Sequence, residues 1–215
     1  KYPNFSEEKK LWKRGYKFVA GLDEAGRGPL AGPVVVAAVN LKFKISNLKS
    51  ILNDPIFKKI KDSKKLSALQ REEIYKILTN HKNIKWGTGI VSEKVIDKIN
   101  ILEATKLAMA KALAHTNFSD RSKLCRMDFL LLDGNFVLDK INIPQKSIVK
   151  GDQKVFSVAA ASIIAKVTRD RLMKKYHKKY PQYGFGKHKG YGTKAHFASL
   201  EKFGPCKIHR KSFWP

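Results

Sequence analysis

The sequence predicts an α/β domain with a mixed β-sheet flanked by helices. Two runs rich in β-branched residues, residues 18–22 and 33–41, stand on either side of a turn rich in Gly and Pro, a pattern typical of paired antiparallel strands. A continuous apolar run over residues 128–133 ends at an Asp-Gly step and is typical of a strand buried on both faces. Together with segments of helical spacing, these strands indicate an α/β fold.

Capping signals and periodicity place the elements between these strands. Ser67, with Gln70 three residues later, forms a capping box that opens a helix through about residue 78. Residues 84–91 are interpreted as a third strand. Ser92 is expected to cap a short helix, and residues 101–114 repeat apolar side chains at the spacing of a helical face.

The last third of the chain is predicted to be mainly helical. A weak strand ending at about residue 150 is followed by one long helix over residues 155–180, apolar at first and strongly basic later. A final helix spans residues 193–203, because Gly204 suits the position after a helix and Pro205 stops it. With 215 residues, the chain has the length of one domain.

Positive charge dominates the composition. The chain holds 44 Lys and Arg against 18 Asp and Glu, a formal net charge of +26. From residue 140 onward there are 18 basic residues and only three acids. A general bias toward lysine would explain the total, but the uneven distribution favours a surface for a polyanion such as a nucleic acid.

Other features of the sequence argue against a membrane span, a disulfide framework, a zinc site and a secretory signal. The longest apolar run, residues 34–39, is far too short for a membrane span. The two cysteines lie far apart, and the six histidines have no zinc-binding spacing, so neither a disulfide framework nor a zinc site is indicated. The opening segment contains Glu7 and Glu8 and does not resemble a secretory signal. We expect a protein of the reducing cytoplasm.

Four of the scarce acidic residues stand at the ends of predicted elements. Asp23 and Glu24 follow the first strand, Asp133 ends the apolar strand, and Asp152 precedes the long helix. If the first and fourth strands are neighbours, these carboxylates meet at one sheet edge, where Mg²⁺ or Mn²⁺ would offset their repulsion. Metal-binding acids in a basic field indicate a nuclease. Spacing alone leaves open that Asp23 and Asp133 are ordinary turn residues.

Six segments resemble, in order, the motifs of ribonuclease HII. They are DEAGRGPLAGP at residues 23–33, DSKKLS at 62–67, DG at 133–134, KGD at 150–152, AAASIIAKVTRDR at 159–171 and HKGYGT at 188–193. The resemblance extends over nearly the whole chain, from about residue 19. It therefore favours a functional role for Asp23 and Asp133 over turn chemistry.

This resemblance implies an RNase H-like core over about residues 17–180 and a helical C-terminal portion, about residues 181–215, that binds substrate. It implies an endonuclease that hydrolyses the RNA strand of RNA–DNA hybrids and cuts 5′ of ribonucleotides embedded in duplex DNA, leaving 5′-phosphate and 3′-hydroxyl ends. Asp23, Glu24, Asp133 and Asp152 would bind two Mg²⁺ or Mn²⁺ ions. We expect the enzyme to act as a monomer.

The resemblance also implies how a ribonucleotide is recognised. Gly26, Arg27 and Gly28 match the turn whose backbone contacts the 2′-hydroxyl, and glycine lets that backbone approach the sugar closely. Tyr191 matches the tyrosine that packs on the deoxyribose after the ribonucleotide. The alternative for Tyr191 is a half-buried ring that stabilises its own loop.

Four further residues match basic or polar positions of the family. Ser63 and Lys64 match a segment that contacts phosphate, although Lys64 by itself resembles any solvated charge. Lys166 and Arg169 either bind phosphate or simply cover the surface of the long helix. The sequence leaves both interpretations open.

Asp152, rather than Asp170, is expected to be the fourth metal-binding carboxylate. The two residues are 18 positions apart, which corresponds to about 27 Å at about 1.5 Å per helical residue, so both cannot bind one metal pair. Asp152 lies at the helix N-terminus, where negative charge is favoured. Asp170 is expected to pair with a nearby Arg.

Two alternative functions explain fewer of these sequence features, and one segment is interpreted as an insertion. Ribonuclease HIII shares the fold but usually carries an additional N-terminal domain, for which the roughly 16 residues before the first strand leave no room. A non-catalytic nucleic-acid-binding module would explain the charge but not the four acids, which weaken phosphate binding. Residues 42–60 look longer than in compact relatives and are interpreted as a surface insertion without function.

Overall fold

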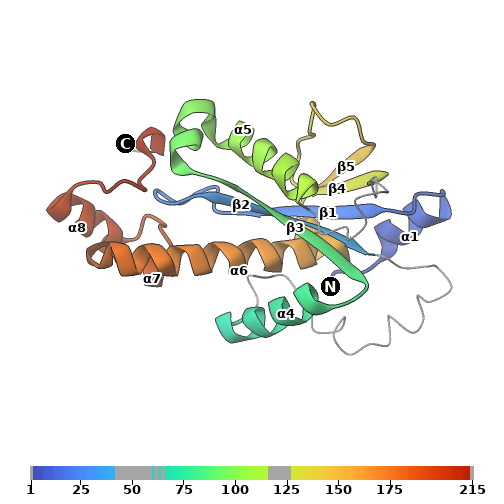
Figure 1. Cartoon of the computed structure of the whole chain (residues 1–215), viewed down its shortest axis with the longest axis horizontal. Helices are drawn as coiled ribbons and strands as arrows, with labels where there is room; N and C mark the ends of the chain where they lie inside the picture. Colours follow the sequence, from blue (N-terminus) through green and yellow to red (C-terminus); the bar gives the residue numbers. More distant parts are fainter. Residues whose placement is uncertain (1, 42–59, 61–62, 64–65, 116–126, 214–215) are drawn as a thin grey trace.

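The computed structural model describes residues 2–41, 60, 63, 66–115 and 127–213 (Figure 1). Lys64 and nearly all of the predicted insertion at residues 42–60 lie outside the described residues.

Five strands form one mixed sheet in the order β3-β2-β1-β4-β5 (Figure 1). β1 is antiparallel to β2, and β2 to β3, whereas β4 is parallel to β1 and β5 to β4. The strands are β1 (Val19–Ala25), β2 (Val34–Leu41), β3 (Ile84–Val91), β4 (Phe129–Asp133) and β5 (Gln145–Ile148). The predicted mixed sheet, and the pairing of the first and fourth strands, are therefore confirmed.

Helices cover both faces of this sheet. α5 (Glu93–Ala114) packs on one face, and α6 (Phe156–Lys179) packs on the other together with α4 (Ala68–Asn80) (Figure 1). α1 (Ser6–Lys13), which the sequence pattern did not predict, contacts β1. Two short helices, α7 (Phe185–His188) and α8 (Lys194–Phe203), lie beyond the C-terminal half of α6 (Figure 1).

Alternation along the strands divides the core into two layers. Val19 and Leu131 belong to the buried cluster under α6, whereas Leu22 and Leu132 belong to the cluster under α5. A Cβ on Gly21 would lie 2.4 Å from backbone atoms of Ser157 and Val158 in α6. The helix backbone therefore rests directly on β1, which brings the first turns of α6 close to the carboxyl end of that strand.

The capping predictions are confirmed at α4 and only partly at α5. The Ser67 N–H donates to Oε1 of Gln70 at 2.8 Å, and the Gln70 N–H donates to Oγ of Ser67 at 3.2 Å. Ser92 precedes α5 as predicted, but its side chain makes no capping hydrogen bond. Asn100, with φ of 64°, interrupts α5, so the two helices expected from the sequence are two segments on either side of a kink.

A third buried cluster joins the turn after β1 to the C-terminal segment. Its members are Ala31, Met173, Tyr183, Phe185, Leu200 and Ile208. Backbone hydrogen bonds connect the same segments, from the N–H of Leu30 to the carbonyl of Gly190 (2.9 Å) and from Gly32 to Ile208 (2.8 Å). Among the residues described, none of the helices has the length and apolar character needed to cross a bilayer.

Candidate active site

Asp23 and Asp133 stand next to each other at the carboxyl ends of two parallel strands. Leu22 of β1 pairs with Leu132 of β4. The side chains of the following residues, Asp23 and Asp133, therefore project from the face of the sheet that α6 covers. β1 extends to Ala25, beyond the predicted end at residue 22, because its pairing with β2 continues to that point. The strand register alone thus brings these two carboxylates together.

Asp23 is buried among other acids. Burial raises the pKa of Asp23 well above its usual range, and the charges of Glu24 and Asp133 raise it further. Hydrogen bonds from the Ser162 side chain and from the Glu24 N–H, 2.7 Å from Oδ1, partly oppose this rise. Negative charge is therefore concentrated at the end of β1, and a divalent cation would offset it.

Asp152 reaches the same edge through a short 3₁₀ helix, η3 (Gly151–Gln153). The Gly151 N–H donates to Oδ1 of Asp133 at 2.6 Å, and this bond docks η3 on the end of β4. Asp152, the next residue, is only 3% exposed. The structure therefore places Asp133 beside Asp23, and Asp152 one residue beyond the bond that joins η3 to the end of β4.

The chemistry of this edge fits a catalytic cation better than a structural one. Among the described residues, no group of three or more acidic, His or Cys side chains is arranged to hold a metal ion. Mg²⁺ typically takes only one or two carboxylates and completes its shell with water and substrate phosphate. The neighbouring oxygens of Asp23 and Asp133 suit that mode of binding.

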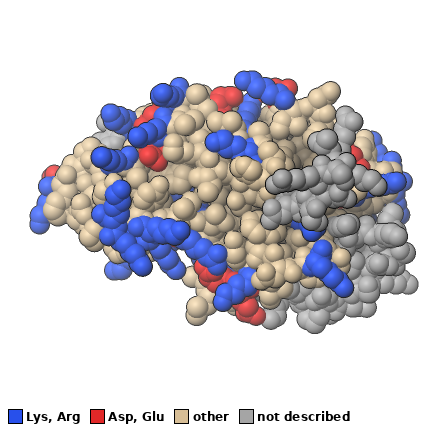
Figure 2. Space-filling view, viewed as in Figure 1, with Lys and Arg blue, Asp and Glu red and all other residues tan. Residues whose placement is uncertain are grey.

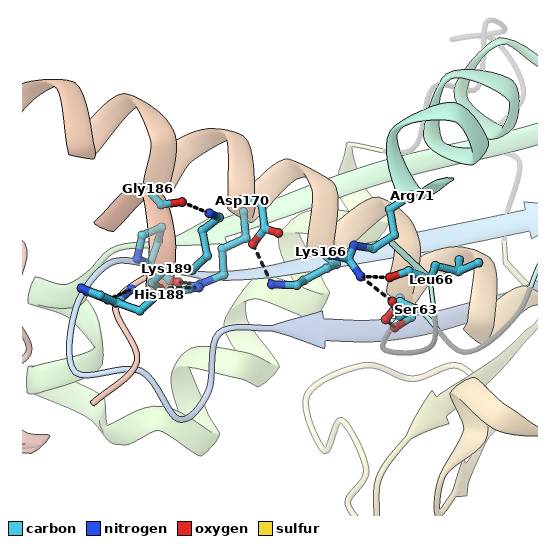
Figure 3. A network of polar contacts seen from close by, with 12 residues as sticks. Ser63, Leu66, Arg71, Lys166, Asp170, Gly186, His188 and Lys189 are labelled. Carbon is cyan, nitrogen blue, oxygen red and sulfur yellow. Dashed lines mark hydrogen bonds and ion pairs between the residues drawn. The ribbon is translucent and has the colours of Figure 1, made fainter. Parts of the chain in front are cut away.

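Asp170 lies apart from this edge, as predicted, but the prediction that it pairs with an Arg is wrong. Its carboxylate pairs with Nζ of Lys166, one helical turn earlier in α6, at 2.7 Å (Figure 3). Lys166 lies on the partly exposed surface of the helix and is engaged in this ion pair.

Ser63 is connected to the acidic edge through a residue that the sequence analysis did not single out. Oγ of Ser63 lies 2.9 Å from Oγ of Ser162, whose side chain also bonds to Asp23. Arg71 donates to the carbonyl oxygens of Ser63 (2.8 Å) and Leu66 (2.5 Å) (Figure 3). The signal available for Ser162 was its polarity within the apolar run of residues 158–165.

Arg169 lies inside the protein, and both interpretations made from the sequence had assumed a surface position. It is 1% exposed, and its guanidinium donates to the carbonyls of Ala31 (3.1 Å), Pro33 (3.0 Å) and Lys189 (3.0 Å). Because each of the three guanidinium nitrogens donates to a carbonyl, the side chain can be buried. Gly26, with φ of 100°, passes so close that a Cβ would lie 2.1 Å from Nε of Arg169.

Arg210, which the sequence analysis did not single out, is hydrogen-bonded to the turn after β1. It is fully buried and donates to the carbonyls of Gly26 (2.6 Å), Arg27 (2.9 Å) and Gly32 (2.9 Å). In a trans peptide the N–H points opposite to the carbonyl, and none of the described peptide bonds is cis. The N–H groups of Arg27 and Gly28 therefore both point away from Arg210.

Tyr191 lies in the loop between α7 and α8 and is 45% exposed. A Cβ on Gly28 would lie 3.9 Å from Cε1 of this ring. Cζ of Arg169 lies 6.0 Å from the ring centroid. The two predicted recognition motifs are far apart in the sequence, yet the structure places Gly28 beside Tyr191.

Basic side chains gather on one side of the molecule near these loops. Figure 2 shows Lys and Arg over the C-terminal half of α6 and over α7. Lys174, Lys175, Lys178 and Lys179 are exposed there. This surface suits a polyanion.

Known proteins resemble this chain over most of its length. The sequence model of a family described as ribonuclease HII matches residues 20–214. A ribonuclease HII of Acetivibrio thermocellus is 52% identical over 206 residues, which are 96% of this chain and 73% of that protein. A ribonuclease HII of Chlamydia caviae is 50% identical over 208 residues, 97% of this chain and 89% of that protein.

Solved structures agree with these sequence matches. A chain in the PCNA:RNase HII complex from Archaeoglobus fulgidus superposes with a TM-score of 0.70 at 26% identity, covering 92% of this chain and 96% of that chain. Ribonuclease H2 from Pyrococcus horikoshii superposes with a TM-score of 0.66 at 28% identity, covering 92% and 93%.

Proposed function

Because this chain belongs to the ribonuclease HII family, we propose that it cuts 5′ of single ribonucleotides embedded in duplex DNA as well as within RNA–DNA hybrids. The chain is a type 2 ribonuclease H, a metal-dependent nuclease that hydrolyses the RNA strand of hybrids. The observation that carries the finer proposal is the position of Gly28 beside the exposed ring of Tyr191, on a turn that begins at the acidic edge.

We infer that Asp23, Glu24, Asp133 and Asp152 bind two divalent cations, Mg²⁺ or Mn²⁺. Such ions, when bound, would supply activation of the attacking water and stabilisation of the leaving 3′ oxygen, which would give 5′-phosphate and 3′-hydroxyl products. The contribution of the chain is to hold its carboxylates in place. Strand pairing positions Asp23 and Asp133, and the Gly151 N–H fixes Oδ1 of Asp133.

Recognition of the ribonucleotide is assigned to the turn after β1. The N–H groups of Arg27 and Gly28 would donate to the 2′-hydroxyl, and the Tyr191 ring would pack on the following sugar, which lacks that hydroxyl. Ser63, Lys64 and Lys166 are proposed phosphate contacts. Residues 181–215 are the proposed substrate-binding portion, and the proposed active form is a monomer.

A cleavage assay with three matched duplexes tests this function. One duplex carries a single ribonucleotide, one is an RNA–DNA hybrid and one is all DNA, and each is incubated with Mg²⁺, with Mn²⁺ or with EDTA. We expect one cut 5′ of the ribonucleotide, a 3′-hydroxyl end that a polymerase extends, and no reaction in EDTA or on DNA. Cleavage of the hybrid without cleavage of the single-ribonucleotide duplex would overturn the finer proposal.

A further inference from the structure

Three histidines lie together next to the Tyr191 loop. They are His188 at the end of α7, His196 in α8 and His209 in the C-terminal segment. The rings of His188 and His196 are stacked, with centroids 4.5 Å apart. Nε2 of His196 lies 3.0 Å from Nε2 of His209, and its Nδ1 lies 2.9 Å from the carbonyl oxygen of Tyr191. His196 and His209 are both buried.

The partners of these rings define one arrangement of protons for a neutral pair. The Tyr191 carbonyl can only accept, so Nδ1 of His196 carries a proton. Nδ1 of His209 lies 2.9 Å from the Cys206 N–H and 3.3 Å from the Cys206 carbonyl oxygen; in the neutral pair it accepts the shorter contact, and Nε2 carries the proton. His209 Nε2 then donates to Nε2 of His196. Each ring has one proton, and each of these three contacts pairs one donor with one acceptor.

A further proton would weaken these contacts. On Nε2 of His196 it would face the N–H of His209 across 3.0 Å, unless the proton of His209 moved to Nδ1 and donated to the Cys206 carbonyl at 3.3 Å. That rearrangement gives up the 2.9 Å bond from the Cys206 N–H and places a charge in a buried site, and both changes are unfavourable. The geometry therefore favours neutral rings.

We propose that His196 and His209 act as one positioning unit for Tyr191, in which the neutral pair holds the Tyr191 carbonyl and so fixes the exposed ring beside Gly28. This inference rests on the proposed role of Tyr191 at the sugar after the ribonucleotide. The Tyr191 carbonyl accepts from the Thr193 N–H at 2.9 Å as well as from His196, so its loop is held at one atom from two directions.

The electrostatic surroundings support neutral rings. Burial, together with the neighbouring His188 and His209, lowers the pKa of His196 to about 4, although the hydrogen bond to the Tyr191 carbonyl opposes this change. Burial also lowers the pKa of His209. The other titratable groups at the pair are Tyr183 and Cys206. Lys189 and His177 act on His188, and Glu93 acts on Cys206. Arg210 follows His209 in the chain but is bonded to the turn after β1.

Two variants at His196 separate positioning from mere packing. The measured quantity is the ratio of cleavage rates on the single-ribonucleotide duplex and on the continuous hybrid. His196→Leu removes the donor to Tyr191 and should lower this ratio by about 3- to 10-fold, the factor that one neutral hydrogen bond supplies. His196→Asn keeps an amide donor near the position of Nδ1 and should retain most of the ratio. His81→Leu, a histidine outside the cluster, is the matched control.

The effects of substituting His196 and His209 on this ratio should not be additive. Because His209 acts only through His196, we expect His209→Leu to lower the same ratio and the double variant His196→Leu/His209→Leu to lose no more than His196→Leu alone. Additive losses would overturn the coupling between the two rings.

Nitrogen NMR of the unsubstituted protein gives a readout that does not depend on whether the variants fold. We expect the Nδ1–H tautomer for His196 and the Nε2–H tautomer for His209 at neutral pH. The opposite tautomer, or a charged ring at either residue, would overturn the proposal.

Tyr191→Ala in the same assay distinguishes the two levels of inference. If Tyr191→Ala lowers the ratio and folded His196→Leu does not, the positioning unit is wrong and the function of Tyr191 stands. If Tyr191→Ala leaves the ratio unchanged, both the sugar contact and the positioning role fail.

Discussion

The acidic edge and the Tyr191 region stabilise their charges in opposite ways. At the edge, Asp23 is buried beside Glu24 and Asp133, and their mutual repulsion raises its pKa. Around Tyr191 the buried cations Arg169 and Arg210 donate to backbone carbonyls, and burial lowers their pKa values to about 10 and about 9. Cations from outside the chain would offset the repulsion at the edge, whereas the loops around Tyr191 are held by the chain's own cations, Arg169 and Arg210. Chemistry and selectivity should therefore be separable by mutation.

The largest expected effect is on the acidic edge alone. Asp133→Asn removes a metal-ligand charge but keeps an oxygen that can accept from the Gly151 N–H, so the fold should survive. We expect cleavage of both the hybrid and the single-ribonucleotide duplex to be abolished. Fluorescence anisotropy without metal should show retained hybrid binding, because the lysines of α6 are unchanged. Normal cleavage by Asp133→Asn would contradict the metal assignment.

Asp152→Asn and Asp170→Asn are a matched pair of variants that test which of the two carboxylates belongs to the acidic edge. Asp152→Asn should be inactive, because Asp152 is buried on the helical turn that docks on β4. Asp170→Asn removes an ion pair with Lys166 that contributes about 0–1 kcal/mol at a partly exposed site, and it should remain active. Rate measurements on the hybrid check both; an inactive, folded Asp170→Asn with an active Asp152→Asn would reverse the assignment.

The recognition region should respond on one substrate only. Tyr191→Ala is expected to reduce cleavage of the single-ribonucleotide duplex by about 10-fold more than cleavage of the hybrid, the scale of one lost stacking contact. Its melting temperature should change little, because the ring is 45% exposed. Equal losses of cleavage rate on both substrates would show that the Tyr191 region does not determine selectivity separately from the acidic edge.

The smallest expected effect on activity is for Glu8, which bonds to the first turn of α6. Glu8 in α1 is buried, and its Oε1 accepts from the Ser157 N–H at 2.8 Å. Burial raises the pKa of Glu8 from 4.5 to about 7. Its contribution to stability is therefore complete below pH 4.5 and is lost as pH rises through about 7, a loss of about 3 kcal/mol.

Glu8→Gln removes this titration and keeps an acceptor for Ser157. Thermal unfolding should show the variant to be more stable than the unsubstituted protein above about pH 8 and similar to it near pH 5. A constant difference across this range would contradict a buried, titrating Glu8. His196 has the reverse dependence, because its lowered pKa of about 4 makes the protein lose stability as pH falls below 6.5. The two regions are thus weakened at opposite ends of the pH scale.

Local patterns in the sequence were sufficient for most elements and for the acidic residues. The capping box at Ser67, the third strand and the long helix follow from signals within a few residues. The end of β1 did not, because Asp23 and Glu24 are poor strand formers, and only pairing with β2 keeps them extended.

Buried polar residues were the principal gap in the sequence analysis. Arg169, Arg210 and His196 are residue types usually found at the surface, and their burial depends on carbonyl or imidazole partners from distant segments. Such partners become visible only when the chain is folded. Motif resemblance located Gly26 and Tyr191 but gave no indication of what holds them in place.

The long-range bonds of Arg210 have a consequence for the order in which the enzyme matures during synthesis. Asp23, Asp133, Asp152 and Ser162 are all translated before residue 163, whereas the arginine that fixes the carbonyls of Gly26 and Arg27 is separated from that turn by more than 180 positions. A growing chain therefore has its acidic residues available before the arginine that holds the turn after β1 has been made. If this turn reads the sugar as proposed, we expect selectivity to be acquired after the acidic residues are in place.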